Sequence, residues 1–128
     1  MGYDILSASD LRTVPAGADL STHQHKFVNL DTNGRAFLSA TAGARCFGVL
    51  QNTPDAQGKA ATIAVKGVSK VKAEGPISKG NMVVASTAGL AITSSTTAHH
   101  RVGRAMEAAT LLGDLIAVEL VPLGPEVP

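Results

Sequence analysis

Two short stretches, Thr32-Asn33-Gly34 and Phe47-Gly48, recur 55 positions later as Thr87-Ala88-Gly89 and Val102-Gly103. The same shift relates a spaced set of glycines in the two halves of the chain: Gly34, Gly48 and Gly58, then Gly89, Gly103 and Gly113. Glycine is kept at a fixed spacing where the backbone turns sharply or passes close to another segment. Because the repeat preserves turn positions more than polar side chains, it indicates a duplicated scaffold rather than a duplicated active site.

The repeat predicts an all-β fold, a small antiparallel β-barrel or sandwich built from two related β units with an extended N-terminal arm. We expect a single domain, because 128 residues fit the usual size of one hydrophobic core. The expected organisation is an arm at 1–13, a β domain at 14–122 with units at about 14–65 and 77–121, and a proline-rich tail at 123–128. Residues 18–25 have no counterpart in the second unit and are expected to form an inserted loop.

Hydrophobic runs bounded by turn residues place the strands. The expected strands are 27–30, 36–38, 46–50, 62–73, 82–85, 90–93, 102–107 and 115–121. Asn33-Gly34 favours a type I′ hairpin turn, since both of its central residues tolerate a positive φ. Residues 104–112 also fit a short helix closed by Gly113, but Pro54 in the first unit favours a strand and a loop.

The composition limits the classes of partner. Aromatic residues make up 3% of the chain and charged residues 16%, with a net charge of +1. A core built from Val, Ile, Leu and Ala favours tight β packing or support from an oligomer. A low-charge surface is typical of a protein that is covered by partners, and the near-neutral balance argues against direct binding to nucleic acid or to a membrane surface.

Cys46 is the only cysteine, so the chain cannot form an internal disulfide. The opening residues 1–6 lack the basic and apolar regions of a signal peptide, and no apolar run reaches the ~20 residues of a membrane span. We therefore expect a soluble protein that is made in the cytoplasm.

Catalytic and metal-binding motifs are weak or absent in the sequence. His23 and His25 alternate along an extended stretch, and His99-His100 form a second pair, but neither pair has a Cys or carboxylate at metal-ligand spacing. Cys46 lies beside Phe47 and is expected to be a buried small apolar residue rather than a nucleophile. With no nucleophile elbow, phosphate loop or close carboxylate pair, we expect no catalytic site, no metal and no cofactor.

A modest basic stripe follows the expected strand at 62–73. Ile63, Val65 and Val71 alternate with lysines along this strand, which predicts one buried face and one basic face. The lysines of the stripe are Lys66, Lys70, Lys72 and, further on, Lys79. They are consistent either with a solvated strand face or with contact to an acidic protein surface.

Four stretches of the second half of the chain together resemble a known family. They are 77–84 (ISKGNMVV), 87–90 (TAGL), 102–108 (VGRAMEA) and the closing apolar strand 115–121. This pattern resembles the small β-rich capsid decoration, or cement, proteins of tailed bacteriophages. The likeness is strongest over 60–121 and looser over 14–58, and the insertion at 18–25 departs from the short form of the family.

The resemblance implies a non-enzymatic virion protein on the outside of the head, made in the host cytoplasm. Such proteins are commonly homotrimers that bind the major capsid protein and hold adjacent subunits together. A trimer would bury the Ala- and Val-rich surface, and a flexible arm would add contact area when it folds on the capsid. We therefore expect the arm and the basic strand face to contact the capsid, through Tyr3, Asp4, Ile5, Leu6, Leu11, Lys66, Lys70 and Lys72.

Two other classes of function are compatible with the sequence. A tail- or fibre-associated module that binds a receptor or glycan would need exposed aromatic residues, and the chain offers only Tyr3, Phe27, Phe37 and Phe47. A lipoyl-type carrier domain would present a lysine at a hairpin tip, whereas Lys70 and Lys72 fall within a strand.

Overall fold

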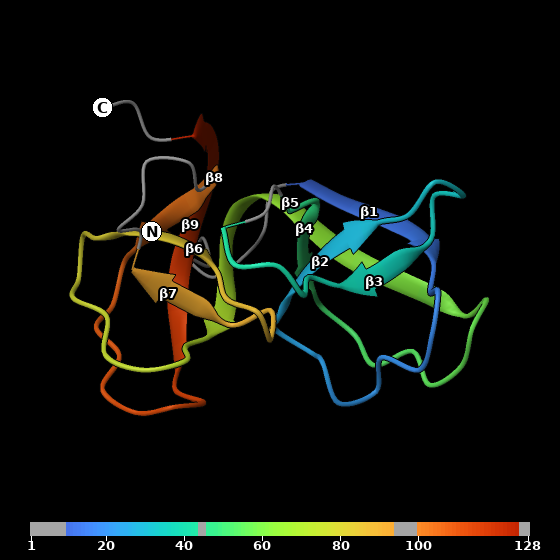
Figure 1. The fold of residues 1–128 in the computed structure, drawn as a ribbon, viewed down its shortest axis with the longest axis horizontal. Helices are drawn as coiled ribbons and strands as arrows, with labels where there is room; N and C mark the ends of the chain where they lie inside the picture. The colour runs from blue at the N-terminus through green and yellow to red at the C-terminus, as the bar shows by residue number, and fades with distance from the viewer. Residues whose placement is uncertain (1–9, 44–45, 94–99, 126–128) are drawn as a thin grey trace, which may run out of the picture.

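The computed structural model describes residues 10–43, 46–93 and 100–125, and within these ranges the chain is all-β (Figure 1). The strands are β1 (Asp10–Pro15), β2 (Phe27–Leu30), β3 (Ala36–Leu38), β4 (Gly48–Leu50), β5 (Ala60–Lys72), β6 (Met82–Ala85), β7 (Ala91–Thr93), β8 (His100–Ala105) and β9 (Leu115–Pro125). They form one curled sheet in the order β3-β2-β4-β5-β9-β8-β6-β7, with β1 also paired to β5. All the strand pairs are antiparallel, which confirms the predicted fold class.

The duplication predicted from the glycines is present in the strand register. Val28 lies opposite Leu38 and Gly48, and 55 residues later Val83 lies opposite Thr93 and Gly103. Figure 1 shows the two groups of strands side by side, β1 to β4 in one lobe and β6 to β9 in the other. Two copies of one strand arrangement therefore make up the sheet.

Strand β5 belongs to both copies. Its first half pairs with β1 and β4, and its second half, from Gly67 to Lys72, pairs with β9. In the second copy, β9 takes the place of the first half of β5, and the second half of β5 takes the place of β1. We call β1 to β4 with the first half of β5 unit one, and the second half of β5 with β6 to β9 unit two.

This arrangement changes the expected limits of the repeat. The first unit begins at β1, so residues 10–13 lie in a strand, although the sequence analysis placed them in the arm. Residues 16–26 link β1 to β2, and residues 73–81 link β5 to β6, so the two links differ by two residues. The expected eight-residue insertion at 18–25 is therefore wrong. Strand β9 extends to Pro125, which places the start of the expected tail in a strand.

The equivalent links make the same hydrogen bonds. The N–H of Ala16 donates to the Lys59 carbonyl at 2.7 Å, and that of Ala73 donates to the Asp114 carbonyl at 2.8 Å. These bonds make Ala73 the structural equivalent of Ala16, so the link of the second unit begins at residue 73. The sequence comparison had instead started the second unit at Ile77.

The β2–β3 and β6–β7 turns also match, but they are not type I′. Only the glycine has a positive φ in each turn, +77° at Gly34 and +74° at Gly89. The Asp31 side chain accepts bonds from the N–H groups of Asn33 and Arg35 in one turn, and the Ser86 hydroxyl accepts equivalent bonds in the other. Because a side chain supports each turn, Asn33 does not need the left-handed conformation that a type I′ turn requires.

A second repeated pair, Gly48 and Gly103, is required by close packing within the sheet. A Cβ at Gly48 would overlap the carbonyl oxygen of Ala64, and a Cβ at Gly103 would overlap that of Glu119. The predicted helix alternative at 104–112 is not adopted, since β8 runs to Ala105 and a loop follows.

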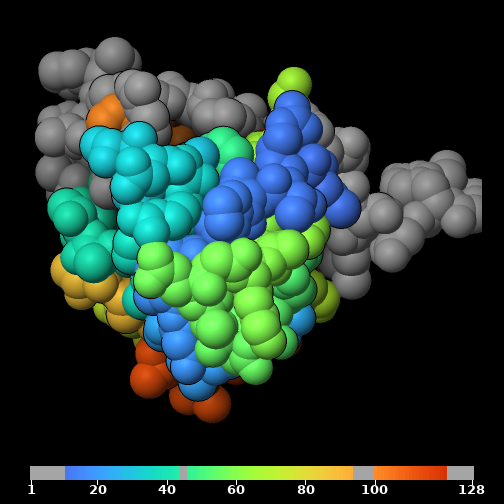
Figure 2. All heavy atoms as spheres, turned by 90° about the vertical axis from the view of Figure 1, so that its right-hand side faces the viewer, coloured from blue at the N-terminus to red at the C-terminus, as the bar shows by residue number. Residues whose placement is uncertain are grey.

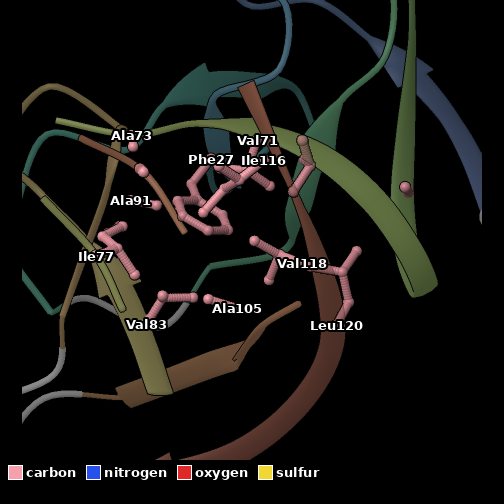
Figure 3. Close-up of a cluster of buried hydrophobic side chains, with 14 residues drawn as sticks. Phe27, Val71, Ala73, Ile77, Val83, Ala91, Ala105, Ile116, Val118 and Leu120 are labelled. Carbon is pink, nitrogen blue, oxygen red and sulfur yellow. The ribbon is translucent and has the colours of Figure 1, made fainter. Parts of the chain in front are cut away.

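The hydrophobic core has two clusters, one within unit one and one shared by both units. The smaller cluster lies within unit one and includes Leu20, Val28 and Ile63. The larger cluster joins the units, because Phe27 and Val49 of unit one pack with unit-two residues such as Ile116. Figure 3 shows Phe27 in this cluster, with Val71 and Ile116 beside it. The units therefore share a core as well as a strand. The described residues contain no helix that is long and apolar enough to cross a membrane.

Candidate partner-binding surface

The predicted partner-binding residues divide into three groups. Residues 3–6 of the arm lie outside the described part of the chain. Leu11 lies on β1, where it is 51% exposed, and Lys66 is exposed on the adjoining stretch of β5. Figure 2 views the side of the molecule that unit one forms, where the blue stretch of chain that contains β1 lies against the green stretch that leads into β5. Lys70 and Lys72 lie in the other half of β5, in unit two.

Lys70 and Lys72 differ in their electrostatic partners. The Lys70 Nζ lies 3.8 Å from Glu107 Oε1, an exposed pair that contributes little to stability. Lys72 makes no ion pair with any described carboxylate. Its backbone N–H donates to the carbonyl oxygen of His25 at 2.9 Å, so the end of β5 lies against the link that leads into β2.

That contact assembles a basic cluster of four half-buried side chains at the boundary between the units: His23, His25, Lys26 and Lys72. The Lys26 Nζ lies 3.2 Å from the Nδ1 atom of His23. The positive charge of Lys72 acts on all three of the other side chains. In the sequence the histidines and the lysines form separate motifs, and Lys26 was not among the predicted residues.

The backbone at His25 is unusual among the described residues. Its φ is +67°, the one positive value that the structure gives for a residue other than glycine. The equivalent residue of unit two is Gly80, with φ +90°, and the N–H groups of both donate to matching carbonyls, those of Leu50 and Ala105. The Nδ1 atom of His25 is buried and has no hydrogen-bond partner. A histidine held here costs stability that the glycine in unit two avoids.

Burial and the neighbouring lysine charges disfavour the protonated forms of three members of the cluster, His23, His25 and Lys26. Burial lowers the pKa of His23 and of His25 below 6.5. The charges of Lys26 and Lys72 lower the pKa of His23 further, and those of Lys72 and Lys70 lower the pKa of His25. Burial and the charge of Lys72 also lower the pKa of Lys26. Asp19 acts in the opposite sense on His23. An added carboxylate from outside the chain would relieve this repulsion, so the cluster is suited to bind an acidic group.

A second surface feature was missed in the sequence. Leu111 and Leu112, in the loop before β9, are 68% and 70% exposed, and Leu115 at the start of β9 is 45% exposed. We call these three leucines the apolar tip. The residues at the matching positions of unit one are Ala56, Gln57 and Ala60. Comparing the repeated positions would have revealed this difference, because apolar residues replace small or polar ones on an equivalent loop.

Two further candidates from the sequence were Cys46 and the pair His99-His100. Burial raises the pKa of the Cys46 thiol to about 11, so it is protonated at neutral pH. The thiol donates to the Ser39 hydroxyl at 3.7 Å and lines a cavity of about 30 Å³ next to Phe27 and Phe47. This volume admits water but not an organic substrate. His100 opens β8, and its neighbour His99 lies outside the described residues.

Across residues 10–43, 46–93 and 100–125, no group of three or more His, Cys, Asp or Glu side chains is placed to hold a metal ion. Besides Leu11 and Lys66, the described residues offer two surface features to a partner, the basic cluster and the apolar tip. Both lie at the end of β5 that belongs to unit two.

Comparisons with known proteins give one family match and one match in fold. The model of the family described as phage cement protein matches residues 8–120. No curated protein sequence matches the chain. Among solved structures, the crystal structure of the head fiber gp8.5 N base in bacteriophage phi29 is similar, with a TM-score of 0.67 over 88% of this chain and 95% of that chain. At 15% sequence identity, this likeness shows a shared fold.

Proposed function

This chain belongs to the phage cement protein family, and we propose that it binds the outer surface of a phage head and stabilises contacts between subunits of the major capsid protein. The family assignment confirms the resemblance seen in the sequence and makes the chain a structural protein of the phage virion. The match over 8–120 carries the proposal, because it spans both units and the boundary between them.

The proposed role is mechanical rather than catalytic. A rigid antiparallel sheet with a core shared between its units can bridge two capsid subunits without deforming. The proposal includes no enzyme activity, no cofactor, no direct contact with nucleic acid and no membrane. The protein is made in the host cytoplasm and resides on the capsid exterior.

The arm and the basic face supply the contacts in this proposal. Tyr3, Asp4, Ile5 and Leu6 add area by ordering on the capsid, and Leu11 and Lys66 continue that contact on the folded domain. Lys70 and Lys72 contribute from unit two. Three copies around a symmetry axis multiply weak contacts of this kind, which supports a homotrimer as the binding form.

Binding to empty heads tests the proposal directly. Phage heads assembled without this protein are mixed with the purified chain, pelleted, and then challenged by heat. We expect saturable binding and a higher temperature of head disruption, while light scattering of the free protein gives a trimer. A chain that stays in the supernatant at every concentration contradicts the proposal.

A deletion of residues 2–13 separates the arm from the folded domain only in part, because residues 10–13 form most of β1. A deletion of 2–9 is the sharper variant, since it leaves every described strand intact. We expect lower occupancy of heads from this variant. If the 2–9 deletion variant occupies heads as fully as the native chain, the arm does not contribute to binding. Binding to host cells or glycans without binding to heads would instead favour the receptor-binding module.

A further inference from the structure

The two loops that precede Ala60 and Leu115 have the same backbone but different surfaces. In unit one, Gly58 donates its N–H to the carbonyl of Ala16, and in unit two Gly113 donates to that of Ala73 at 2.7 Å. The unit-one loop is polar, and Lys59 Nζ lies 2.7 Å from Asp55 Oδ1 on its exposed side. The unit-two loop carries the apolar tip instead. Since unit one forms this loop with Ala56, Gln57 and Ala60, the fold does not require the exposed leucines.

The apolar tip meets the basic cluster at one residue pair of the sheet. Leu115 lies directly opposite Lys72 in the β5–β9 pair, and residues opposite each other on antiparallel strands project from the same face. The N–H of Ala73, the next residue after Lys72, donates to the carbonyl of Asp114 at 2.8 Å. Leu115 of the apolar tip and Lys72 of the basic cluster therefore lie on one face of the sheet. At the matching pair of unit one, Pro15 lies opposite Ala60, so that unit has neither the cation nor the leucine.

We propose that the apolar tip and the basic cluster form one docking surface for a protein segment in which apolar side chains are flanked by carboxylates. The leucines take up the apolar side chains, and Lys26 and Lys72, which have no described carboxylate within ion-pair distance, take up the carboxylates. Given the proposed function, on which this identification of the partner rests, the segment belongs to the capsid surface.

The charges argue against a second copy of this chain as the occupant. Two copies that met through this surface about a two-fold axis would bring Lys26 and Lys72 of one copy close to those of the other, and like charges in an interface are unfavourable. Three leucines are also too few to form a stable interface by themselves, which needs about 800 Å² from each partner. They serve as an anchor within a larger contact to the capsid.

Unit one supplies the variants that test this proposal. Leu111→Ala, Leu112→Gln and Leu115→Ala together install the residues that unit one has at the same positions. We expect this triple variant to bind empty heads at least about tenfold more weakly, with an unchanged thermal midpoint. Lys72→Gln should weaken binding by about threefold at low salt and less at high salt. The matched unit-one controls, Gln57→Ala and Lys59→Gln, should bind as the native chain does.

Nuclear magnetic resonance provides a readout that does not depend on heads. An acidic hexapeptide with two central leucines is titrated into the native chain, and we expect shifts at residues 111, 112, 115 and 72 but not at 56–60. If the native chain ignores heads but shows these shifts, the docking surface stands and the proposed function falls. If heads bind the triple variant as tightly as the native chain, or the peptide shifts no signal at the apolar tip, the docking surface is wrong. A trimer that dissociates in the triple variant likewise overturns it in favour of self-association.

Discussion

Units one and two have the same strands in the same register, but the matching turns lie in different surroundings. Gly34, in the β2–β3 turn, faces open space. Gly89, in the β6–β7 turn, packs on unit one, since the N–H of Phe27 donates to its carbonyl at 2.8 Å. The β6–β7 turn of unit two therefore contacts unit one, while Gly34 in the β2–β3 turn packs against no neighbouring segment. Duplication reproduced the backbone, and each copy then acquired its own contacts.

The largest expected effect comes from the residue that joins the two units. Phe27 is fully buried in the shared core, whereas the equivalent residue Met82 is half-buried. Phe27→Ala should lower the free energy of unfolding by about 3–5 kcal/mol, because it leaves a cavity among residues of both units. Met82→Ala should have a smaller effect. Urea unfolding of both variants measures the difference, and equal losses would show that the shared core is not asymmetric.

The matching turns provide the next contrast. Alanine at either glycine carries a strain of about 1 kcal/mol, because both have a positive φ. At Gly89 the new Cβ would also meet the side chain of Leu38 and lie 3.0 Å from the Phe27 carbonyl oxygen. Gly89→Ala should therefore be clearly more destabilising than Gly34→Ala, by a further ~1–3 kcal/mol. Similar midpoints in urea for the two variants would argue that the β6–β7 turn does not pack on unit one.

A smaller effect is expected at His25, which stands where unit two has Gly80. His25→Gly should be more stable than His25→Ala by about 1 kcal/mol, because glycine accepts the positive φ without strain. Gly80→Ala should lose a similar amount. The difference in urea midpoint between the two His25 variants isolates the backbone term, since both lack the imidazole ring. No difference between them would mean that the backbone at this position relaxes when the ring is removed.

The smallest effect is the dependence of stability on pH. The pKa values of His23 and His25 lie below 6.5 in the folded chain, so the unfolded chain binds protons first as the pH falls. Their contribution is present above pH 6.5 and is lost as the pH falls through the lower, folded values. Asp19, Lys26, Lys70 and Lys72 are the charged groups that act on the two rings.

Unit two supplies the control for this effect, because it has Ser78 and Gly80 at the matching positions. The double variant His23→Ser/His25→Gly should lose less thermal stability between pH 7.5 and 5.5 than the native chain. If the native and variant midpoints shift equally over this range, other groups carry the pH dependence.

Much of the fold could be predicted, because the spacing of glycines and the alternation of apolar and polar residues are local features of the sequence. The strands at 27–30, 36–38 and 82–85 are confirmed at their expected limits. The change of partners within β5 could not be predicted, because the alternation over 62–73, interrupted only at Val68, does not show which strand lies alongside. For the same reason, the start of unit two was placed at Ile77 instead of within β5.

The site was predicted less completely, for a different physical reason. Lys72 and His25 are far apart in the sequence, and only the hydrogen bond between their backbones brings their side chains into one cluster. Leu111 and Leu112 were read as part of a loop, since an exposed leucine looks the same as a buried one in a sequence. Only the comparison with Ala56 and Gln57 shows that the fold does not need them.

A cryo-electron microscopy map of heads decorated with the native chain tests the central claim most directly. If the scaffold is duplicated and the proposed docking surface of unit two binds the capsid, the chain lies on the outer surface with the apolar tip and the basic cluster against the shell. The polar loop at 55–60 then faces away from the shell or into solvent. A map in which the unit-one loop contacts the shell while Leu111 and Leu112 are in solvent would contradict the account.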